Sequence, residues 1–425
     1  MNSIAIIGLG YVGLPLALQF ARSGVQVIGL DIDSAKTEAL NAGRSYIAHV
    51  SGDEVKARHD AGLLEASTDF SRIARVDAVI LCVPTPLNAY REPDLSYVLD
   101  TGRAIAPHLA KGTLVVLEST TYPGTTDTEL REVLERGSGM KAGSDFHLAF
   151  SPEREDPGNP DSKVAAIPKV VGGLTPACLD KAVALYQKSI TTVVPVSSCR
   201  VAEAAKLLEN IFRSVNIALV NELKLVYGAM DIDVWEVIEA AKTKPFGYMP
   251  FYPGPGLGGH CIPIDPFYLT WKAREFGMHT RFIELAGEIN TAMPDHVVKV
   301  VFEALNEAGK AVKGAHVLIL GLAYKADVDD DRESPTYKLI EKLEALGARV
   351  SYHDPHIPVI PKTREHAEYA GRQSVDSLDG DYDLMLLSTG HAEYKVRDFS
   401  GTGIPLVDTR NAVAPGMRPD NYHKA

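Results

Sequence analysis

The sequence predicts an α/β protein with two doubly wound parallel-sheet domains joined by a long central helix. Residues 3–31 and residues 313–346 each place a short apolar strand before a glycine turn and a helix, which is the order found in parallel βαβ units. Between them, residues 198–228 contain no proline, have glycine only at the last position and keep apolar residues at helical spacing. With 425 residues, the chain is long enough for two or three domains.

The composition is that of a globular protein, and the net charge makes nucleic acid an improbable partner. Hydrophobic residues make up 45% of the chain and charged residues 23%, so each domain can bury a core. The formal net charge of -12 argues against nucleic acid as the main partner, because binding to a phosphate backbone needs a basic surface. A small anionic ligand remains possible, since it needs only a local cluster of donors.

The cysteines and the apolar start of the chain bear on its location. Cys82, Cys178, Cys199 and Cys261 show no close pairing and no metal-ligand spacing, which favours a reducing, cytoplasmic setting and no bound metal. Residues 4–20 are apolar enough to resemble a signal or membrane segment. Three glycines, one proline and the absence of a preceding basic residue count against both, so no membrane association is expected.

The first glycine turn has the spacing of a dinucleotide site. Gly8, Gly10 and Gly13 follow an apolar run and open a helix; the first allows the turn, the second a close approach of pyrophosphate, and the third close helix packing. The next expected strand ends at Asp31, whose carboxylate would accept both ribose hydroxyls and so favours NAD over NADP. The N-terminal part is therefore predicted to be a Rossmann-like NAD-binding domain.

Polar residues also follow later strands of this sheet. Thr85 comes after the expected strand at 77–83, and Thr120 after the one at 113–117. Since ligands of open parallel sheets bind beyond the carboxyl ends of the strands, both threonines fall where cofactor and substrate should meet. Turn or capping roles are the alternative for each. Glu153, in the charged loop after a further expected strand, is either a site residue or part of a solvated surface.

The loop at residues 253–265 has the most unusual composition. It holds four glycines and three prolines around Cys261 and Asp265. Glycines let the backbone approach a ligand and prolines keep the loop rigid, so Cys261 would be presented on a fixed, exposed turn, as a nucleophile requires. From this stretch alone an inert cysteine is an equal alternative, because most free cysteines are small buried hydrophobic residues.

On the expected long helix, Lys206 and Asn210 are four positions apart and share one face. Taken alone, they are better explained as surface residues, with Glu203 and Glu209 as ion-pair partners of the lysine. The helix is also long enough to offer a surface for oligomer formation.

The second glycine turn differs from the first in its charge. Lys325 and Arg332 follow it, and they could hold a diphosphate by charge as well as by backbone contacts. The acidic run at 327–331 and residues 353–356 resemble metal ligands. A solvated loop and a strand end explain them better.

Taken together, these segments resemble the UDP-glucose/GDP-mannose 6-dehydrogenase family over essentially the whole chain. In order, the motifs are GLGYVGLP at 8–15, EST at 118–120, SPER at 151–154, Lys-x3-Asn on the helix, GPGLGGHCIPIDP at 254–266 and GLAYKADVDDDRESP at 321–335. Ile264 stands where many UDP-glucose enzymes have lysine. The segment HCIPIDPFYL most resembles the corresponding segment of those family members that oxidise UDP-N-acetylglucosamine for bacterial surface polysaccharides such as O-antigen and capsule.

The resemblance implies NAD as the cofactor, a UDP-sugar as the substrate and a homodimer or a higher homo-oligomer. It implies two successive oxidations of the C6 hydroxyl of a UDP-N-acetylhexosamine, for which UDP-N-acetyl-D-glucosamine is expected, with two NAD reduced per sugar. Cys261 would capture the intermediate aldehyde as a thiohemiacetal. A second hydride transfer would then give a thioester, which water cleaves to the carboxylate.

The resemblance also implies roles for individual residues. Lys206 and Asn210 would stabilise the oxyanion near C6, Asp265 would act with Lys206 as acid and base and activate water, and Thr120 and Glu153 would position a water or the substrate. The implied cofactor residues are Gly8, Gly10, Val12, Gly13, Asp31, Lys36, Thr85, Thr120 and Arg332. The implied UDP-sugar residues are Glu153, Lys206, Asn210, Phe251, Tyr252, Pro253, Gly254, Gly258 and Lys325.

The expected domains are an NAD-binding Rossmann-like domain at 1–197, a central helical and dimerisation domain with the cysteine loop at 198–300, and a UDP-sugar-binding Rossmann-like domain at 301–425. The chain departs from the family pattern at two points. Pro157 stands where the family often has a second glutamate, so it is given no role. An arginine donated by the partner subunit has no clear match, and Lys244 is the nearest cation.

Other activities are weighed against this one. UDP-glucose or UDP-N-acetylmannosamine are alternative substrates. A two-electron hydroxyacid-type dehydrogenase would share the first nucleotide fold and the helical lysine, yet would need neither Cys261 nor a second nucleotide half. Tyr268 and Lys272 match the Tyr-x3-Lys pair of short-chain reductases and epimerases, but the match is isolated and lacks that family's glycine spacing. Binding of UDP-sugars without turnover is disfavoured by the intact cysteine, lysine and aspartate.

Overall fold

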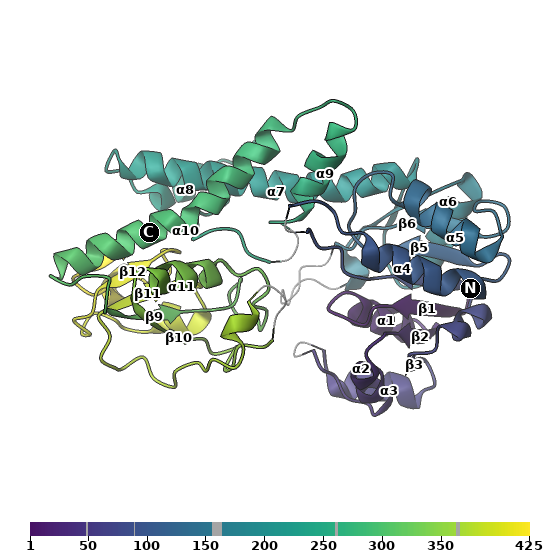
Figure 1. The fold of residues 1–425 in the computed structure, drawn as a ribbon, viewed down its shortest axis with the longest axis horizontal. Helices are drawn as coiled ribbons and strands as arrows, with labels where there is room; N and C mark the ends of the chain where they lie inside the picture. The colour runs from purple at the N-terminus through teal and green to yellow at the C-terminus, as the bar shows by residue number, and fades with distance from the viewer. Residues whose placement is uncertain (48–49, 89, 155–163, 260–261, 363–365) are drawn as a thin grey trace. The chain divides into compact units, whose positions relative to one another are not determined.

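The computed structural model describes residues 1–47, 50–88, 90–154, 164–259, 262–362 and 366–425 (Figure 1). These residues form two compact units. The first comprises Met1–Glu209 and Phe267–Met278, and the second Asn210–Pro266 and His279–Ala425. The chain passes from the first unit to the second inside helix α7 (Cys199–Gly228) and briefly returns to the first at residues 267–278. No helix in the described part of the chain is both long and apolar enough to span a membrane.

The first unit is built on a sheet whose described strands run in the order β3-β2-β1-β4-β5-β6-β7-β8. Neighbouring strands pair parallel, except that β6 and β7 pair antiparallel. The order reverses between β1 and β4, as in doubly wound nucleotide-binding sheets. The strands are β1 Ser3–Ile7, β2 Gln26–Leu30, β3 Leu64–Ser67, β4 Ala78–Leu81, β5 Leu114–Leu117, β6 His147–Phe150, β7 Lys169–Gly173 and β8 Val193–Val196.

Helices cover both faces of this sheet, so its inner strands are buried on both sides, whereas the edge strands β3 and β8 are partly exposed. Along β1, Ile4 and Ile6 belong to one core and Ala5 and Ile7 to the other, which is the alternation expected for a strand between two layers. The helices of this unit, besides the start of α7, are α1 Gly13–Arg22, α2 Ser34–Asn41, α3 Gly52–Asp60, α4 Ser96–Ile105, α5 Arg131–Ser138, α6 Pro176–Tyr186 and most of α9 Asp265–Arg274. Shorter helical segments are Phe70–Arg75, Ala106–His108, Thr126–Leu130 and Val164–Ala166.

The second unit contains a smaller sheet, which is parallel throughout its described strands. Their order is β10-β9-β11-β12-β13. The strands are β9 His316–Leu320, β10 Arg349–His353, β11 Leu384–Leu387, β12 Leu406–Asp408 and β13 Tyr422–Lys424. The helices, besides the rest of α7, are α8 Val234–Lys242, α10 Arg281–Glu307, α11 Pro335–Ala345 and α12 Ala392–Val396, with short helical segments at Ala367–Tyr369 and Pro415–Met417.

The two Rossmann-like parallel sheets and the long central helix confirm the predicted fold class. Local signals placed these elements well: the apolar spacing over 198–228 matches α7, and Ser334 caps α11 by accepting the Thr336 N–H. The three-part division at 1–197, 198–300 and 301–425 stays a prediction. The two compact units reflect which segments pack against one another and do not test a division by function.

Glu203 fastens α7 to the loop that follows β5. Its side chain is fully buried and accepts hydrogen bonds from Gly124 N–H at 2.7 Å, Thr126 N–H at 3.0 Å and Thr126 Oγ1–H at 2.7 Å. These donors favour the ionised carboxylate, but the loss of hydration outweighs them and raises the pKa of Glu203 to about 7. Its charge therefore changes near neutral pH.

We expect Glu203 to make the free energy of unfolding depend on pH. Its pKa is higher in the folded chain than the ordinary value of 4.5, so the folded state binds more protons between these values and stability falls as pH rises through about 7. The contribution reaches about 3 kcal/mol. Urea unfolding of the wild type and Glu203→Gln at about pH 5.5 and pH 8 isolates it: the stability advantage of the wild type should shrink at the higher pH. A difference that does not change with pH would contradict this account.

Candidate functional site

The first glycine turn is shaped by close backbone contacts at two of its three glycines. Gly8, directly after β1, has φ +87°, and a Cβ there would lie 2.5 Å from the Cys82 carbonyl oxygen. A Cβ on Gly13 would lie 1.9 Å from the Gly8 carbonyl oxygen. A Cβ on Gly10, by contrast, would meet no protein atom within 4 Å. Packing therefore explains Gly8 and Gly13, whereas room for a ligand explains Gly10, which fits the predicted pyrophosphate contact.

Asp31 lies beside this turn, one residue after β2. Its Oδ2 accepts the Leu9 N–H at 2.9 Å and its Oδ1 accepts the Asp33 N–H at 3.0 Å. The Lys36 ammonium lies 3.5 Å from Oδ2. Tyr46, which the sequence did not single out, donates from its hydroxyl to the Leu9 carbonyl oxygen at 2.5 Å. The structure thus brings the predicted cofactor residues Asp31 and Lys36 together at the turn; Val12 directly precedes α1.

Thr85 and Thr120 follow the carboxyl ends of the adjacent strands β4 and β5. Ser119 couples the two strand ends, because its hydroxyl accepts the Val83 N–H at 3.0 Å and donates to the Val83 carbonyl oxygen at 2.6 Å. The Thr85 carbonyl oxygen accepts the hydroxyl of Tyr268 on α9. Both threonines therefore lie at the ligand-binding edge that doubly wound sheets share.

The rival Tyr-x3-Lys pair has structural partners in the first unit. Tyr268 is fully buried, and its hydroxyl is engaged by the Thr85 carbonyl oxygen. The Lys272 ammonium lies 4.8 Å from the centre of the Tyr122 ring, close enough for a cation–π contact. These contacts explain both side chains without a catalytic role.

Four of the predicted catalytic residues form two contacting pairs. In the first unit, the Lys206 ammonium lies 3.5 Å from Glu153 Oε2, and both side chains are largely buried. In the second unit, Asn210 Nδ2 donates to Asp265 Oδ2 at 2.6 Å, and both residues are buried. Lys206 and Asn210 are one turn apart on α7, and Asp265 is the first residue of α9. Cys261 lies outside the described residues.

Buried amides hold the backbone before the cysteine. The Gly254 N–H donates to Asn221 Oδ1 at 3.0 Å, Asn221 Nδ2 donates to Asn290 Oδ1 at 2.9 Å, and Asn290 Nδ2 donates to the Ser214 carbonyl oxygen at 3.1 Å. This chain of hydrogen bonds joins α7 and α10 to the loop. Because each amide is buried and satisfied, the position of Gly254 is well specified. Phe251, Tyr252 and Pro253 directly precede it.

Two glycines of the same loop are required by packing. A Cβ on Gly258 would lie 2.8 Å from the Tyr324 Cβ, and one on Gly254 would lie 2.3 Å from the Arg410 guanidinium. Tyr324 immediately precedes Lys325 in the second glycine turn. The structure therefore gathers three of the predicted UDP-sugar residues, Gly254, Gly258 and Lys325, around one loop of the second unit.

Arg410 was missed by the sequence analysis. It follows β12, and its Nε donates to the Ser388 carbonyl oxygen at 3.1 Å. Burial lowers the pKa of Arg410 to about 10, against an opposing effect of Asp408. Lys224 on α7 is also buried, and its pKa falls to about 7 because of burial first and the Arg410 charge second. The available signal was a basic residue in the loop just after a short apolar stretch, two positions beyond the end of β12.

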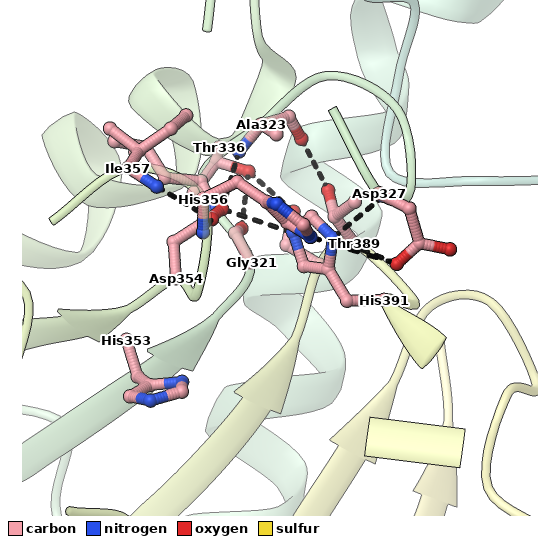
Figure 2. Close-up of polar contacts among 12 residues, drawn as sticks. Gly321, Ala323, Asp327, Thr336, His353, Asp354, His356, Ile357, Thr389 and His391 are labelled. Carbon is pink, nitrogen blue, oxygen red and sulfur yellow. Dashed lines mark hydrogen bonds and ion pairs between the residues drawn. The ribbon is translucent and has the colours of Figure 1, made fainter. Parts of the chain in front are cut away.

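The second glycine turn has the same backbone shape as the first, but the carboxylate beside it, Asp354, accepts more hydrogen bonds from the protein. Gly321 has φ +88°, and Asp354 Oδ2 accepts the N–H groups of Leu322 at 2.7 Å and Ala323 at 2.9 Å. Figure 2 shows Asp354 near Ala323 and His391. Arg332 is held by Asp330, to which its Nε and Nη2 donate at 2.8 and 2.6 Å.

Comparison with known proteins agrees with this geometry. Residues 2–190, 200–292 and 318–415 match, in order, the NAD binding, central and UDP binding domains of the UDP-glucose/GDP-mannose dehydrogenase family. The chain is 36% identical over 394 residues to a UDP-N-acetyl-D-glucosamine 6-dehydrogenase of Pseudomonas aeruginosa, covering 92% of this chain and 91% of that protein. It is 34% identical over 420 residues to a UDP-N-acetyl-D-mannosamine dehydrogenase of Pyrococcus horikoshii, covering 96% of each.

A solved structure extends this similarity to the backbone. The UDP-N-acetylmannosamine dehydrogenase structure from Pyrococcus horikoshii superposes with a TM-score of 0.89 at 33% identity, covering 99% of this chain and 98% of that one. The similarity in fold thus extends along the whole chain, and the three domain matches follow in the family's order. The chain belongs to the UDP-glucose/GDP-mannose dehydrogenase family and is an NAD-dependent UDP-sugar 6-dehydrogenase.

Proposed function

We propose that this enzyme oxidises the C6 hydroxyl of UDP-N-acetyl-D-glucosamine twice, through a thioester on Cys261, to give the uronic acid. The observation that carries the proposal is the buried hydrogen bond between Asn210 and Asp265. It holds a carboxylate four residues after the proposed nucleophile and an amide donor one helical turn from Lys206. A single two-electron oxidation would not need the thiol of Cys261 in addition to such a pair.

Each side chain has a distinct part in the proposed chemistry. Bound NAD supplies the hydride acceptor for both oxidations. Lys206 and Asn210 donate to the oxygen at C6 and stabilise the charge that develops there. The Cys261 thiolate adds to the aldehyde carbon and forms the carbon–sulfur bond of the thiohemiacetal. Asp265 takes a proton from the water that later cleaves the thioester, so the thiol is released with the carboxylate product.

Other residues would bind and position the reactants. We propose that Thr120 and Glu153 orient a water or the sugar, and the ion pair of Glu153 with Lys206 fits that role. Cofactor binding is proposed for Gly8, Gly10, Val12, Gly13, Asp31, Lys36, Thr85, Thr120 and Arg332. Sugar-nucleotide binding is proposed for Glu153, Lys206, Asn210, Phe251, Tyr252, Pro253, Gly254, Gly258 and Lys325.

The choice of sugar rests on the cysteine loop and on the relatives. The sequence HCIPIDPFYL, with Ile264 before Asp265, favours an N-acetylhexosamine, and a relative of 36% identity is a UDP-N-acetyl-D-glucosamine 6-dehydrogenase. UDP-N-acetylmannosamine is the second candidate, because a relative of 34% identity is named for it. The uronic acid product would serve a surface polysaccharide such as capsule or O-antigen.

We also propose a cytoplasmic homodimer or higher homo-oligomer formed through α7. The described cysteines Cys82, Cys178 and Cys199 are free thiols, as a reducing compartment requires. Large apolar side chains of α7 are exposed to solvent: Val201, Leu208, Phe212, Leu219, Leu225 and Val226. A second copy of the chain would cover such a surface.

We expect two NADH to form for each UDP-sugar consumed, because the thiohemiacetal is oxidised again before release. Limiting UDP-N-acetylglucosamine with excess NAD, followed by absorbance at the NADH band, gives this ratio. Cys261→Ala should form no uronic acid, since the aldehyde has no thiol to capture it. Cys178→Ala, which removes a buried thiol of α6, is the matched control and should keep the ratio of two. A ratio of one, or full activity in Cys261→Ala, would favour a two-electron dehydrogenase.

Asp265→Asn should lower kcat by at least about a hundredfold, because an amide cannot take the proton of the hydrolytic water. The KM for the UDP-sugar should change by no more than about threefold, since asparagine keeps the size of the side chain. Steady-state kinetics, compared with the exposed-carboxylate control Asp376→Asn, measure both constants. A variant that keeps the wild-type kcat would remove Asp265 from the proposed mechanism.

Substrate choice is tested by NADH production with a panel of nucleotide sugars. UDP-N-acetylglucosamine should give a higher kcat/KM than UDP-glucose, UDP-N-acetylgalactosamine, UDP-N-acetylmannosamine or GDP-mannose. The reason is that the sequence of the cysteine loop resembles that of the enzymes for N-acetylhexosamines. GDP-mannose should be poorest, since it differs in the base as well as the sugar. A clear preference for UDP-glucose would overturn the assignment.

A further inference from the structure

The backbone before Lys325 is held at both of its polar groups. Ala323, two residues earlier, donates its N–H to Asp354 Oδ2 at 2.9 Å. Its carbonyl oxygen accepts the Thr389 hydroxyl at 2.6 Å. Figure 2 shows these contacts at one end of the loop. The peptide groups on both sides of Ala323 are therefore fixed by residues that follow β10 and β11.

The backbone after Lys325 is held by a second group of contacts. Asp327, two residues later, donates its N–H to His391 Nδ1 at 2.9 Å, and its Oδ1 accepts the Ala392 N–H at 2.9 Å. Asp327 has φ +61°, a conformation that costs free energy for a residue other than glycine. The contacts with His391 and Ala392 compensate for that cost, so the path of the loop depends on them.

The imidazole of His391 links the two groups of contacts. His391 is fully buried. Since its Nδ1 accepts the Asp327 N–H, the ring hydrogen belongs on Nε2, which donates to Asp354 Oδ2 at 3.1 Å. One ring thus connects the carboxylate that holds Ala323 to the backbone of Asp327. Figure 2 shows His391 between Asp354 and Asp327.

The same geometry argues against a metal ion at this place. Possible ligand atoms of Asp327, His356 and His391 lie within 4.8 Å of one another. However, both ring nitrogens of His391 already take part in hydrogen bonds within the protein, whereas a metal ligand needs a free lone pair. These side chains are better explained as a hydrogen-bonded cluster that holds the loop around Lys325 than as a cation site.

We infer that His391 is a positioning residue that sets Lys325 for binding of the substrate's diphosphate. The inference rests on the proposed function, which gives Lys325 a role in UDP-sugar binding. Lys325 lies midway between Ala323 and Asp327, and His391 is tied to the anchors of both. A lysine contributes most to affinity when its backbone is already placed before the ligand arrives, because less conformational freedom is then lost on binding.

Two amide substitutions separate the two contacts of His391. Glutamine places its amide near the position of Nε2, so His391→Gln keeps a donor for Asp354 and loses the acceptor for the Asp327 N–H. Asparagine places its amide oxygen near Nδ1, so His391→Asn keeps that acceptor. His356→Gln is the matched control, because the His356 ring lies in the same cluster but its Nε2 is 3.8 Å from Asp327 Oδ1.

The test measures UDP and NAD binding to the full chain by isothermal titration calorimetry. His391→Gln should raise the Kd for UDP about tenfold, the size expected for one lost buried hydrogen bond. His391→Asn should restore most of that affinity, and His356→Gln should bind UDP as the wild type does. The Kd for NAD should stay the same in all three variants, which a general loss of folding would not allow.

A double-mutant cycle with Lys325→Ala shows whether His391 acts through the lysine. If it does, adding His391→Gln to Lys325→Ala should change the Kd for UDP by less than about twofold, because the lysine to be positioned is gone. Additive effects, or wild-type UDP affinity in His391→Gln, would overturn the inference while leaving the proposed function intact. Wild-type UDP affinity in Lys325→Ala would instead overturn the role proposed for Lys325, and the inference with it.

Discussion

A carboxylate one residue after the second strand holds the glycine turn in each nucleotide fold. Asp31 Oδ2 accepts the Leu9 N–H at 2.9 Å, and Asp354 Oδ2 accepts the Leu322 N–H at 2.7 Å. The strand registers that lead to these contacts correspond, because Ile7 pairs with Leu30 and Leu320 with His353. The following glycine has φ +87° in one fold and +88° in the other. The same physical constraint therefore shapes both ligand-binding turns.

The two turns differ in what surrounds this shared contact. Gly10 leaves open space where its counterpart in the second fold is the fully buried Ala323, whose N–H is taken by Asp354. Asp354 also accepts two further backbone N–H groups and the His391 ring. The second carboxylate is thus fully occupied by the protein, and its turn lacks the open glycine suited to pyrophosphate. In the proposed mode of binding, the charge of Lys325 replaces the backbone contact with the diphosphate that this turn does not offer.

Sequence patterns correctly predicted those elements whose structure depends mainly on residues close together in the sequence. Glycine spacing located both turns and apolar spacing located α7, since each depends on residues close in sequence. Contacts between distant segments were not predictable in this way: Tyr268 reaches the carbonyl oxygen of Thr85, and Arg410 packs against Gly254. For the candidate site, sequence indicated Lys206, Asn210 and Asp265 individually, but their burial and pairing required the fold. The exposure of Cys261 stays a prediction, because that residue lies outside the described part of the chain.

Helix α7 departs from the usual pattern of an amphipathic helix, because it buries several polar side chains and exposes several large apolar ones. Six of its polar side chains are buried: Glu203, Lys206, Asn210, Ser214, Asn221 and Lys224. Several of its large apolar side chains are instead exposed. Burying polar groups costs free energy unless each finds a partner, and the contacts of Glu203 with the loop after β5, of Asn210 with Asp265 and of Asn221 with Asn290 supply such partners. The exposed apolar side chains support the proposed oligomer, because a second copy of the helix would bury them without disturbing the buried polar side chains.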